Sequence, residues 1–221
     1  MSTHTQNQET ILVIDFGGQY NQLIARRVRE CGVYCEICSY RKPLEEILKK
    51  NLKGIIFTGG PASVYLENAA VIDKSIYERG IPILGICYGA QLMSHQLGGR
   101  VEKAPEREYG KTLVNLDTTS LLFSGLAEKN ICWMSHNDTI FEAAPGFRIT
   151  ASTPDCPVAA SEDASRKLYN VQFHPEVLHT ENGVKMLSNF VYKVCGCAGT
   201  WKMDSFVEAT IKALKIGRAH V

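Results

Sequence analysis

The sequence predicts an α/β fold with an open, mostly parallel but mixed sheet and helices on both faces. Short apolar runs alternate with helical segments up to about residue 100, a pattern typical of parallel strands joined by crossover helices. Beyond that point, strand-like segments follow one another with only turns between them, which predicts antiparallel additions to the sheet. With 221 residues, of which 45% are hydrophobic, the chain can bury one large core.

The first half of the chain supplies the expected parallel strands and their helices. "ILVIDF" (11–16) is a short apolar run, which is typical of a buried strand. Leu23, Ile24 and Val28 share one face of the helix expected next, which ends at a glycine. Further strands are expected at 33–38, 54–60 and 81–86, and further helices at 43–51 and 88–99.

The second half of the chain supplies the expected antiparallel strands and a last helix. Val184, Leu187 and Val191 lie on one face of that helix. Open α/β sheets bind ligands at the carboxyl ends of their strands, so the functional site is expected among those loops. The strands are expected at 111–117, 131–136, 148–153, 157–162 and 167–173, and the helix at 182–194.

Charge and hydropathy argue against a nucleic-acid-binding, a membrane-spanning or a secreted protein. The net charge of +1 gives no reason to expect nucleic acid or a membrane surface as a partner. Residues 1–9 are polar, contain no apolar signal region and are expected to form a disordered arm. No apolar run approaches the roughly 20 residues that span a bilayer. We therefore expect a cytoplasmic protein.

The eight cysteines are expected to be reduced thiols, because the chain is long and shows no secretion signal. Cys31, Cys35 and Cys38 invite a metal interpretation, but no second pair completes a four-ligand zinc set at a familiar spacing. Cys195 and Cys197 are too close in sequence for ordinary disulfide geometry. The sequence thus predicts neither a metal site nor a disulfide.

A candidate nucleophile lies in "GICYGAQ" (85–91), directly after an expected strand. Cys87 stands between glycines in the pattern G-x-nucleophile-x-G, in which a strained turn presents the nucleophile and larger flanking side chains would clash. The helix beginning at Tyr88 would favour the thiolate, and the Tyr88 N–H would stabilise an oxyanion. The alternative is a small cysteine packed where a strand meets a helix.

A base for this thiol is expected at His174, where the strand in "LYNVQFHPE" ends. Glu176 follows two residues later, close enough to hydrogen-bond the far imidazole nitrogen and complete a triad of nucleophile, base and orienting acid. His95 lies about two helical turns beyond Cys87, too far to take its proton directly. The alternatives are a surface histidine and a solvated carboxylate.

A second oxyanion donor is expected in "FTGGPAS" (57–63). The paired glycines Gly59 and Gly60 follow a strand and let backbone amides approach a ligand closely. A simple turn before Pro61 explains the same residues equally well.

Several separated segments resemble one known family. "GICYGAQ" together with "VQFHPEV" resembles the class I, triad-type glutamine amidotransferases. "ILVIDFGGQYNQLIARRVRE", "REYGKT", "WMSHND", "VQFHPEVLHT" and "CGCAGTW" are most similar to the amidotransferase domain of GMP synthetases, over about residues 10–205. The resemblance implies a flavodoxin-like fold.

The resemblance also implies an activity, the hydrolysis of glutamine to glutamate and ammonia through a cysteine thioester. It assigns nucleophilic attack to Cys87, proton transfer to His174 and the orientation of that histidine to Glu176. It places the oxyanion hole at the amides of Gly60 and Tyr88. The residues that it implies for binding substrate glutamine are Gln91, Ser135, His136, Asn137 and Asp138.

Two residues depart from the family pattern. Asn137 stands in "SHND" where the family usually has glycine, and Asn170 stands in "YNVQF" where glycine is frequent. Asparagine tolerates left-handed backbone angles better than most residues. The turn expected at Asn137 should therefore persist.

The resemblance further implies a partner. The amidotransferase domain is expected over 10–202, and 203–221 is expected to begin a linker to an ATP-dependent synthetase part that aminates XMP to GMP. That part, in cis or in trans, would bind ATP and magnesium, so no cofactor is expected in this chain. Residues 216–221, "IGRAHV", match one reading frame of a common sequencing adapter and are interpreted as an artefact.

Three other interpretations stay open. The acceptor of ammonia could belong to the anthranilate or aminodeoxychorismate pathway, which "DFGGQY" and "VLHT" disfavour by family resemblance. A non-catalytic regulatory or binding domain of the same fold would be supported by the loss of Cys87 or His174, and both are present. Another α/β cysteine hydrolase or peptidase would lack the combined His-Pro-Glu and Ser-His-x-Asp segments.

Overall fold

A computed structural model describes residues 8–48 and 51–203 of the chain, without the side chains of 105–107. Most of the expected N-terminal arm (1–9) and of the expected linker (203–221) lies outside the described residues, as does the whole of 216–221. Within the described part, no helix is both long and apolar enough to cross a membrane.

One nine-stranded sheet organises the chain, in the order β2-β1-β3-β4-β9-β8-β7-β5-β6. The five strands from β2 to β9 pair in parallel, and the remaining pairs are antiparallel. The strands are β1 (Thr10–Asp15), β2 (Tyr34–Ser39), β3 (Leu52–Phe57), β4 (Ile83–Ile86), β5 (Arg100–Leu116), β6 (Lys129–Glu142), β7 (Arg148–Ser152), β8 (Ala160–Asp163) and β9 (Leu168–Val171). The expected mixed sheet is confirmed, and its parallel part has the flavodoxin-like order.

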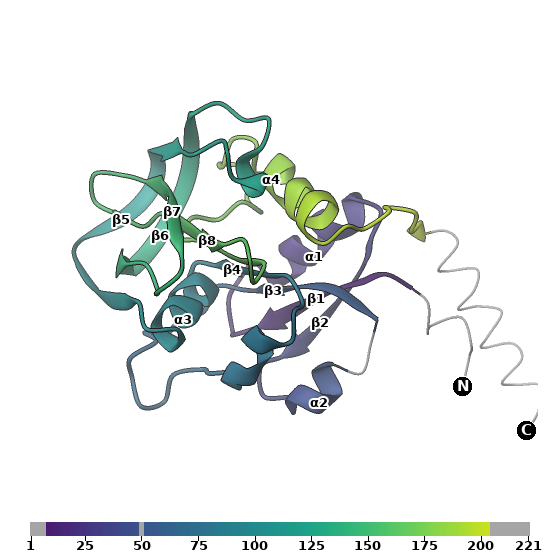
Figure 1. Cartoon of the computed structure of the whole chain (residues 1–221). Coiled ribbons are helices and arrows are strands. Elements are labelled where there is room, and N and C mark those ends of the chain that lie inside the picture. The colour runs from purple at the N-terminus through teal and green to yellow at the C-terminus, as the bar shows by residue number, and fades with distance from the viewer. Residues whose placement is uncertain (1–7, 49–50, 204–221) are drawn as a thin grey trace, which may run out of the picture.

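Helices cover both faces of the parallel part, as expected (Figure 1). The α-helices are α1 (Asn21–Glu30), α2 (Leu44–Ile47), α3 (Tyr88–Gln96) and α4 (Gly183–Asn189), and the short 3₁₀ turns are η1 (Lys74–Glu78) and η2 (Leu121–Phe123). Figure 1 shows α1 and α4 on one side of the sheet and α2 and α3 on the other.

The alternation of side chains along β1 shows why both faces are covered. Ile11 and Val13 pack into one cluster with apolar residues of α1 and α4. Leu12 and Ile14 pack into a second cluster with residues of α2, η1 and α3. Because successive side chains of a strand point to opposite faces, a continuous apolar run needs a helix on each side.

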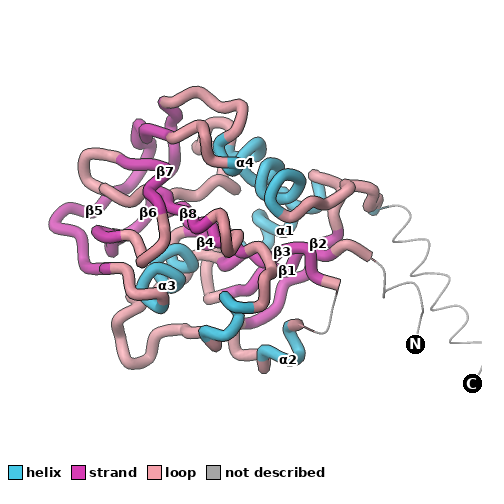
Figure 2. The backbone as a smooth tube through the Cα atoms, in the orientation of Figure 1, coloured by secondary structure: helices cyan, strands magenta, loops and turns pink. Residues whose placement is uncertain are grey.

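The antiparallel part differs most from the expected boundaries. β5 and β6 form a ribbon of 17 and 14 residues, far longer than the expected strands at 111–117 and 131–136. The first half of β5 is rich in charged residues, so it lacks the apolar pattern of a buried strand, and only pairing with β6 makes it a strand. Figure 2 shows the two strands curving together at the end of the molecule away from β2. The last expected helix also divides, into α4 and the π-helical turn η3 (Phe190–Val194).

Candidate active site

Cys87 lies on a strained turn between β4 and α3. Its φ of 53° and ψ of −107° fall in a region that non-glycine residues rarely adopt. A Cβ atom added at Gly85 would lie 2.7 Å from the Gly89 carbonyl oxygen, and one at Gly89 would lie 2.5 Å from Cβ of Phe57. The steric reason expected for both flanking glycines is therefore present in the structure.

The pairing of β4 with β9 brings the second candidate residue to this turn. The Cys87 N–H donates to the carbonyl oxygen of Val171, the last residue of β9, at 2.9 Å. The chain then continues to His174, whose N–H donates to the Trp133 carbonyl oxygen of β6 at 3.0 Å. Three strands thus fix the position of the imidazole.

His174 and Glu176 form a buried pair. His174 Nδ1 lies 2.7 Å from Glu176 Oε1, and the two side chains are 6% and 0% exposed. With Nδ1 at Glu176, the other ring nitrogen is left to interact with the Cys87 side chain. A Cβ atom added at Gly59 would lie 3.4 Å from His174 Cε1 and 3.9 Å from Cys87 Cβ, so glycine leaves room beside both residues. The structure thus brings together the three residues of the predicted triad.

The electrostatics of the pair favour a charged imidazole. Burial lowers the pKa of His174, but the Glu176 carboxylate and the Cys87 sulfur outweigh burial and raise that pKa well above its usual value. An imidazolium beside a sulfur stabilises a thiolate, the form in which cysteine is a nucleophile.

This charge predicts a pH dependence of stability. A histidine with a raised folded-state pKa stabilises the folded protein fully below its unfolded value of about 6.5, and this contribution is lost as the pH rises through the raised pKa. We expect His174→Asn to flatten the fall in the free energy of unfolding between neutral and alkaline pH. Denaturant unfolding at a series of pH values measures this free energy. The control is His95→Asn, which replaces an exposed histidine. Parallel pH profiles of the His174 variant and the unmodified chain would contradict the prediction.

The backbone donors predicted for an oxyanion lie close to Cys87. No hydrogen bond in the described part of the chain uses the N–H of Gly60 or of Tyr88. A Cβ atom added at Gly60 would lie 3.0 Å from Tyr88 Cγ, so the two residues are packed together. The predicted donors are therefore adjacent to each other and to the nucleophile turn.

β6 forms another wall of the site. The Ser135 carbonyl oxygen lies 3.8 Å from Cys87 Sγ. Gln91 is buried on α3, and its Nε2 donates to the Asp138 carbonyl oxygen at 2.7 Å, which fixes this part of β6 to the helix that follows Cys87. The Asp138 carboxylate accepts a hydrogen bond from the Tyr65 hydroxyl at 3.0 Å. Of the predicted substrate residues, Gln91, Ser135 and Asp138 thus lie around the turn that carries Cys87. The side chains of His136 and Asn137 instead meet Glu108 and Tyr109.

Similarity to known proteins identifies the family. The family model "Glutamine amidotransferase class-I" matches residues 12–194. The chain belongs to this family. Among curated relatives, a GMP synthase (glutamine-hydrolysing) of Lachnospira eligens is 62% identical over 97% of this chain, and one of Acetivibrio thermocellus is 58% identical over 95%. The chain spans 41% of the length of each of these two relatives.

Solved structures agree with this class I amidotransferase assignment. A Thermoplasma acidophilum protein, described as one of the subunits of a GMP synthase, is 34% identical, with a TM-score of 0.79 over 86% of this chain and 95% of that one. A glutamine amidotransferase of Thermotoga maritima has a TM-score of 0.69 over 86% of this chain and 100% of that one. Because the Thermotoga maritima protein is only 16% identical to this chain, the comparison with it shows a shared fold and nothing more.

Neither of the two asparagines singled out by the family resemblance occupies a left-handed turn. The expected turn at Asn137 is wrong, because the residue lies inside extended β6. Among the described residues, only Cys87, Lys167 and Asn182 are non-glycine residues with positive φ. The side chain of Asn137 accepts a hydrogen bond from Tyr109 on β5 at 3.0 Å. Asn170 is buried in β9, where its Nδ2 donates to the Ser94 hydroxyl at 3.4 Å.

Several residues that hold the imidazole had no role predicted from the sequence. The Tyr20 ring contacts the His174 ring edge-to-face at 5.3 Å. Arg27 of α1 donates from Nε to the Glu176 carbonyl oxygen at 3.2 Å, and the Thr180 hydroxyl donates to the His174 carbonyl oxygen at 2.6 Å. The segments "GGQYNQLIARRV" and "VLHT", which the family resemblance already singled out, contain these residues.

Proposed function

We propose that this chain hydrolyses glutamine to glutamate and ammonia, and that the ammonia passes to a synthetase part that uses ATP to aminate XMP to GMP. The observation that carries the proposal is the buried His174–Glu176 pair beside Cys87 on its strained turn. This arrangement has the three roles of a cysteine hydrolase: a nucleophile, a base and a group that orients the base.

In the first half-reaction, the Cys87 thiolate attacks the side-chain amide carbon of glutamine. The carbonyl oxygen becomes an oxyanion, which the N–H groups of Gly60 and Tyr88 stabilise. The carbon–nitrogen bond then breaks, the proton on His174 goes to the leaving nitrogen, and ammonia departs. A γ-glutamyl thioester remains on the sulfur.

In the second half-reaction, neutral His174 takes a proton from water while the water oxygen attacks the thioester. The carbon–sulfur bond breaks, glutamate leaves and the thiolate–imidazolium pair returns. Glu176 holds Nδ1 of the imidazole at 2.7 Å in both steps, so that Nε2 stays directed at the reacting atoms. Gln91, Ser135 and Asp138 position the substrate.

The choice of XMP as the acceptor of ammonia is inferred from the relatives of this chain. Those at about 60% identity are named GMP synthase (glutamine-hydrolysing), and this chain corresponds to about 41% of their length. The rest of such a protein would bind ATP, magnesium and XMP, so this chain needs no cofactor of its own for the hydrolysis. The same relatives do not favour a chorismate-type acceptor or a non-catalytic domain.

The test measures glutamate released from glutamine by this chain, alone and with a separately produced synthetase part of a relative. We expect release that rises when the synthetase part, ATP and XMP are all present. Release that does not respond to these additions would contradict the proposal that XMP accepts the ammonia. The proposal that the chain hydrolyses glutamine would still stand. No release from folded protein under either condition would contradict the hydrolysis itself.

Replacing Glu176 is expected to cost less activity than replacing the nucleophile. The carboxylate only orients and charges the imidazole, so we expect Glu176→Ala to lose about 100-fold less in kcat than Cys87→Ala does. Glutamate release under saturating glutamine compares the two, with Glu181→Ala, an exposed carboxylate close in sequence, as the control. Equal losses in the two variants would argue against an orienting role.

A further inference from the structure

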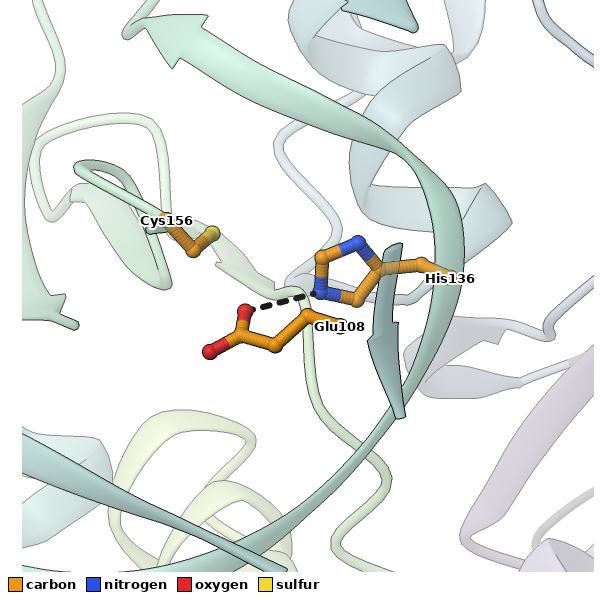
Figure 3. Close-up of side chains that lie close together, drawn as sticks. All are labelled: Glu108, His136 and Cys156. Carbon is orange, nitrogen blue, oxygen red and sulfur yellow. Dashed lines mark ion pairs between the residues drawn. The ribbon is translucent and has the colours of Figure 1, made fainter. Parts of the chain in front are cut away.

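A second cluster of reactive side chains includes the residue that follows Ser135 on β6. It consists of Glu108 on β5, His136 on β6 and Cys156 in the loop between β7 and β8 (Figure 3). One ligand atom from each residue lies within 4.8 Å of the other two, and this is the only such group of three found among the described residues. Glu108 and His136 are cross-strand partners in the β5–β6 ribbon.

The polar atoms at the centre of this cluster lack hydrogen-bond partners. His136 Nε2 and Glu108 Oε2 lie 3.4 Å apart, with side chains 1% and 11% exposed. Neither atom has a hydrogen-bond partner, although both are buried. The two atoms face each other as an ion pair without hydrogen-bond geometry (Figure 3). A buried polar atom that makes no hydrogen bond is costly, so a cation bound to both atoms would satisfy them.

We propose that Glu108, His136 and Cys156 form a binding site for a divalent cation of the zinc type. Thiolate, imidazole and carboxylate are the ligands that zinc takes in proteins, at about 2.0–2.3 Å each. Two nitrogen or oxygen ligands on one tetrahedral ion lie about 3.4 Å apart, which is the separation of the His136 and Glu108 atoms. The three side chains leave the fourth position for a water molecule.

The neighbours of the three ligands are arranged to hold them in place. The Thr153 hydroxyl donates to Glu108 Oε1 at 3.1 Å, which leaves Oε2 for the cation. The Thr139 hydroxyl lies 3.5 Å from His136 Nδ1, the ring nitrogen away from the cluster. Such contacts fix the orientation and tautomer of metal ligands.

Cys156 is suited to be a buried metal ligand rather than a reactive thiol at the surface. The residue is 0% exposed, and its N–H donates to the Thr153 hydroxyl at 2.8 Å. Burial raises the pKa of its thiol, and the Glu108 carboxylate raises it further, so the thiol is protonated and inert without a cation. A bound dication reverses this and displaces the proton.

The site would cross-link the β5–β6 ribbon to the loop that contains Cys156. Ser135, whose carbonyl oxygen faces Cys87, directly precedes the ligand His136. The cation would therefore act as a structural clamp next to the β6 residue that faces Cys87, without contacting the nucleophile itself.

Cobalt(II) binding to the full-length chain tests the site, because a thiolate on tetrahedral Co²⁺ gives near-ultraviolet and visible absorption bands. All measurements use a Cys87→Ala background, which removes the thiol that also faces a histidine. We expect one equivalent of Co²⁺ with these bands, displaced by Zn²⁺. Adding Cys156→Ala should abolish the thiolate band, and adding Glu108→Gln should weaken binding at least about 10-fold.

Cys132→Ala in the same background is the matched control, because Cys132 is equally buried on β6 and lies outside the cluster. It should keep the band and the affinity. Zinc should also raise the unfolding temperature of the Cys87→Ala chain more than that of the Glu108→Gln variant, which retains every other side chain of the cluster. Absence of the band, a band that survives Cys156→Ala, or an affinity that Glu108→Gln leaves unchanged would overturn the proposal.

Discussion

Replacing Cys87 with alanine is expected to abolish glutamine hydrolysis and leave the fold intact. In the proposed mechanism the acyl group is carried on Sγ, and loss of the nucleophile from a triad costs on the order of 10⁶-fold in kcat. Alanine keeps the backbone N–H that bonds to Val171 at the end of β9. The measurement is glutamate release in the presence of the synthetase part, ATP and XMP. His174→Ala should lose nearly as much, because the thiol then has no base.

The control for this prediction is Cys38→Ala, which removes a half-buried thiol from β2 at the edge of the sheet. It should keep the activity of the unmodified chain. A chloroketone analogue of glutamine gives a readout that does not depend on turnover, because it should alkylate Cys87 and no other cysteine. Activity retained by the Cys87→Ala chain, or alkylation at a different thiol, would contradict the assignment of the nucleophile.

The local part of this site could be predicted from the sequence. The two glycines around Cys87 indicate a turn that tolerates no flanking side chain, and the structure shows the close contacts that forbid one. The pair His174 and Glu176 is local as well, because the side chains that meet are only two positions apart in the chain. Residues that are only a few positions apart in the chain have a relative geometry that their spacing alone can predict.

The meeting of Cys87 with His174 could not be predicted from spacing. Four strands come between β4 and β9 in the chain, yet β4 and β9 are neighbours in the sheet. Only the topology brings their carboxyl ends together. The sequence singled out His174 by its place at a strand end beside Glu176, which says nothing about its distance from Cys87. The hydrogen bond from Arg27 of α1 to the Glu176 carbonyl oxygen depends on the same topology.

The segment from Ser135 to Asp138 shows a different limit. It was expected to contain a turn, but it lies in β6, where successive side chains face opposite sides. Asn137 therefore meets Tyr109, whereas His136 meets Glu108 and Cys156. The charged first half of β5 gives no apolar signal, so neither its pairing with β6 nor this cluster could be predicted from periodicity.

Replacing Gly89 with alanine is expected to destabilise the fold by about 3 kcal/mol, near the upper end of the cost of overpacking a core. The added Cβ atom would lie 2.5 Å from Cβ of Phe57 and 2.7 Å from its carbonyl oxygen, so the helix that begins at Tyr88 would have to move away from β3. The helix preference for alanine over glycine offsets only about 1 kcal/mol. Denaturant unfolding gives the free energy change.

Gly80→Ala separates this steric effect from a purely conformational one. Gly80 has a φ of +68° and nothing within 4 Å of an added Cβ, so alanine there costs only the left-handed strain of about 1 kcal/mol. Moving α3 away from β3 also moves the strained turn at Cys87, so Gly89→Ala should lose glutaminase activity under conditions in which it is still folded. A Gly89→Ala chain as stable and as active as the Gly80→Ala chain would show that the close packing of α3 on β3 does not hold the nucleophile in place.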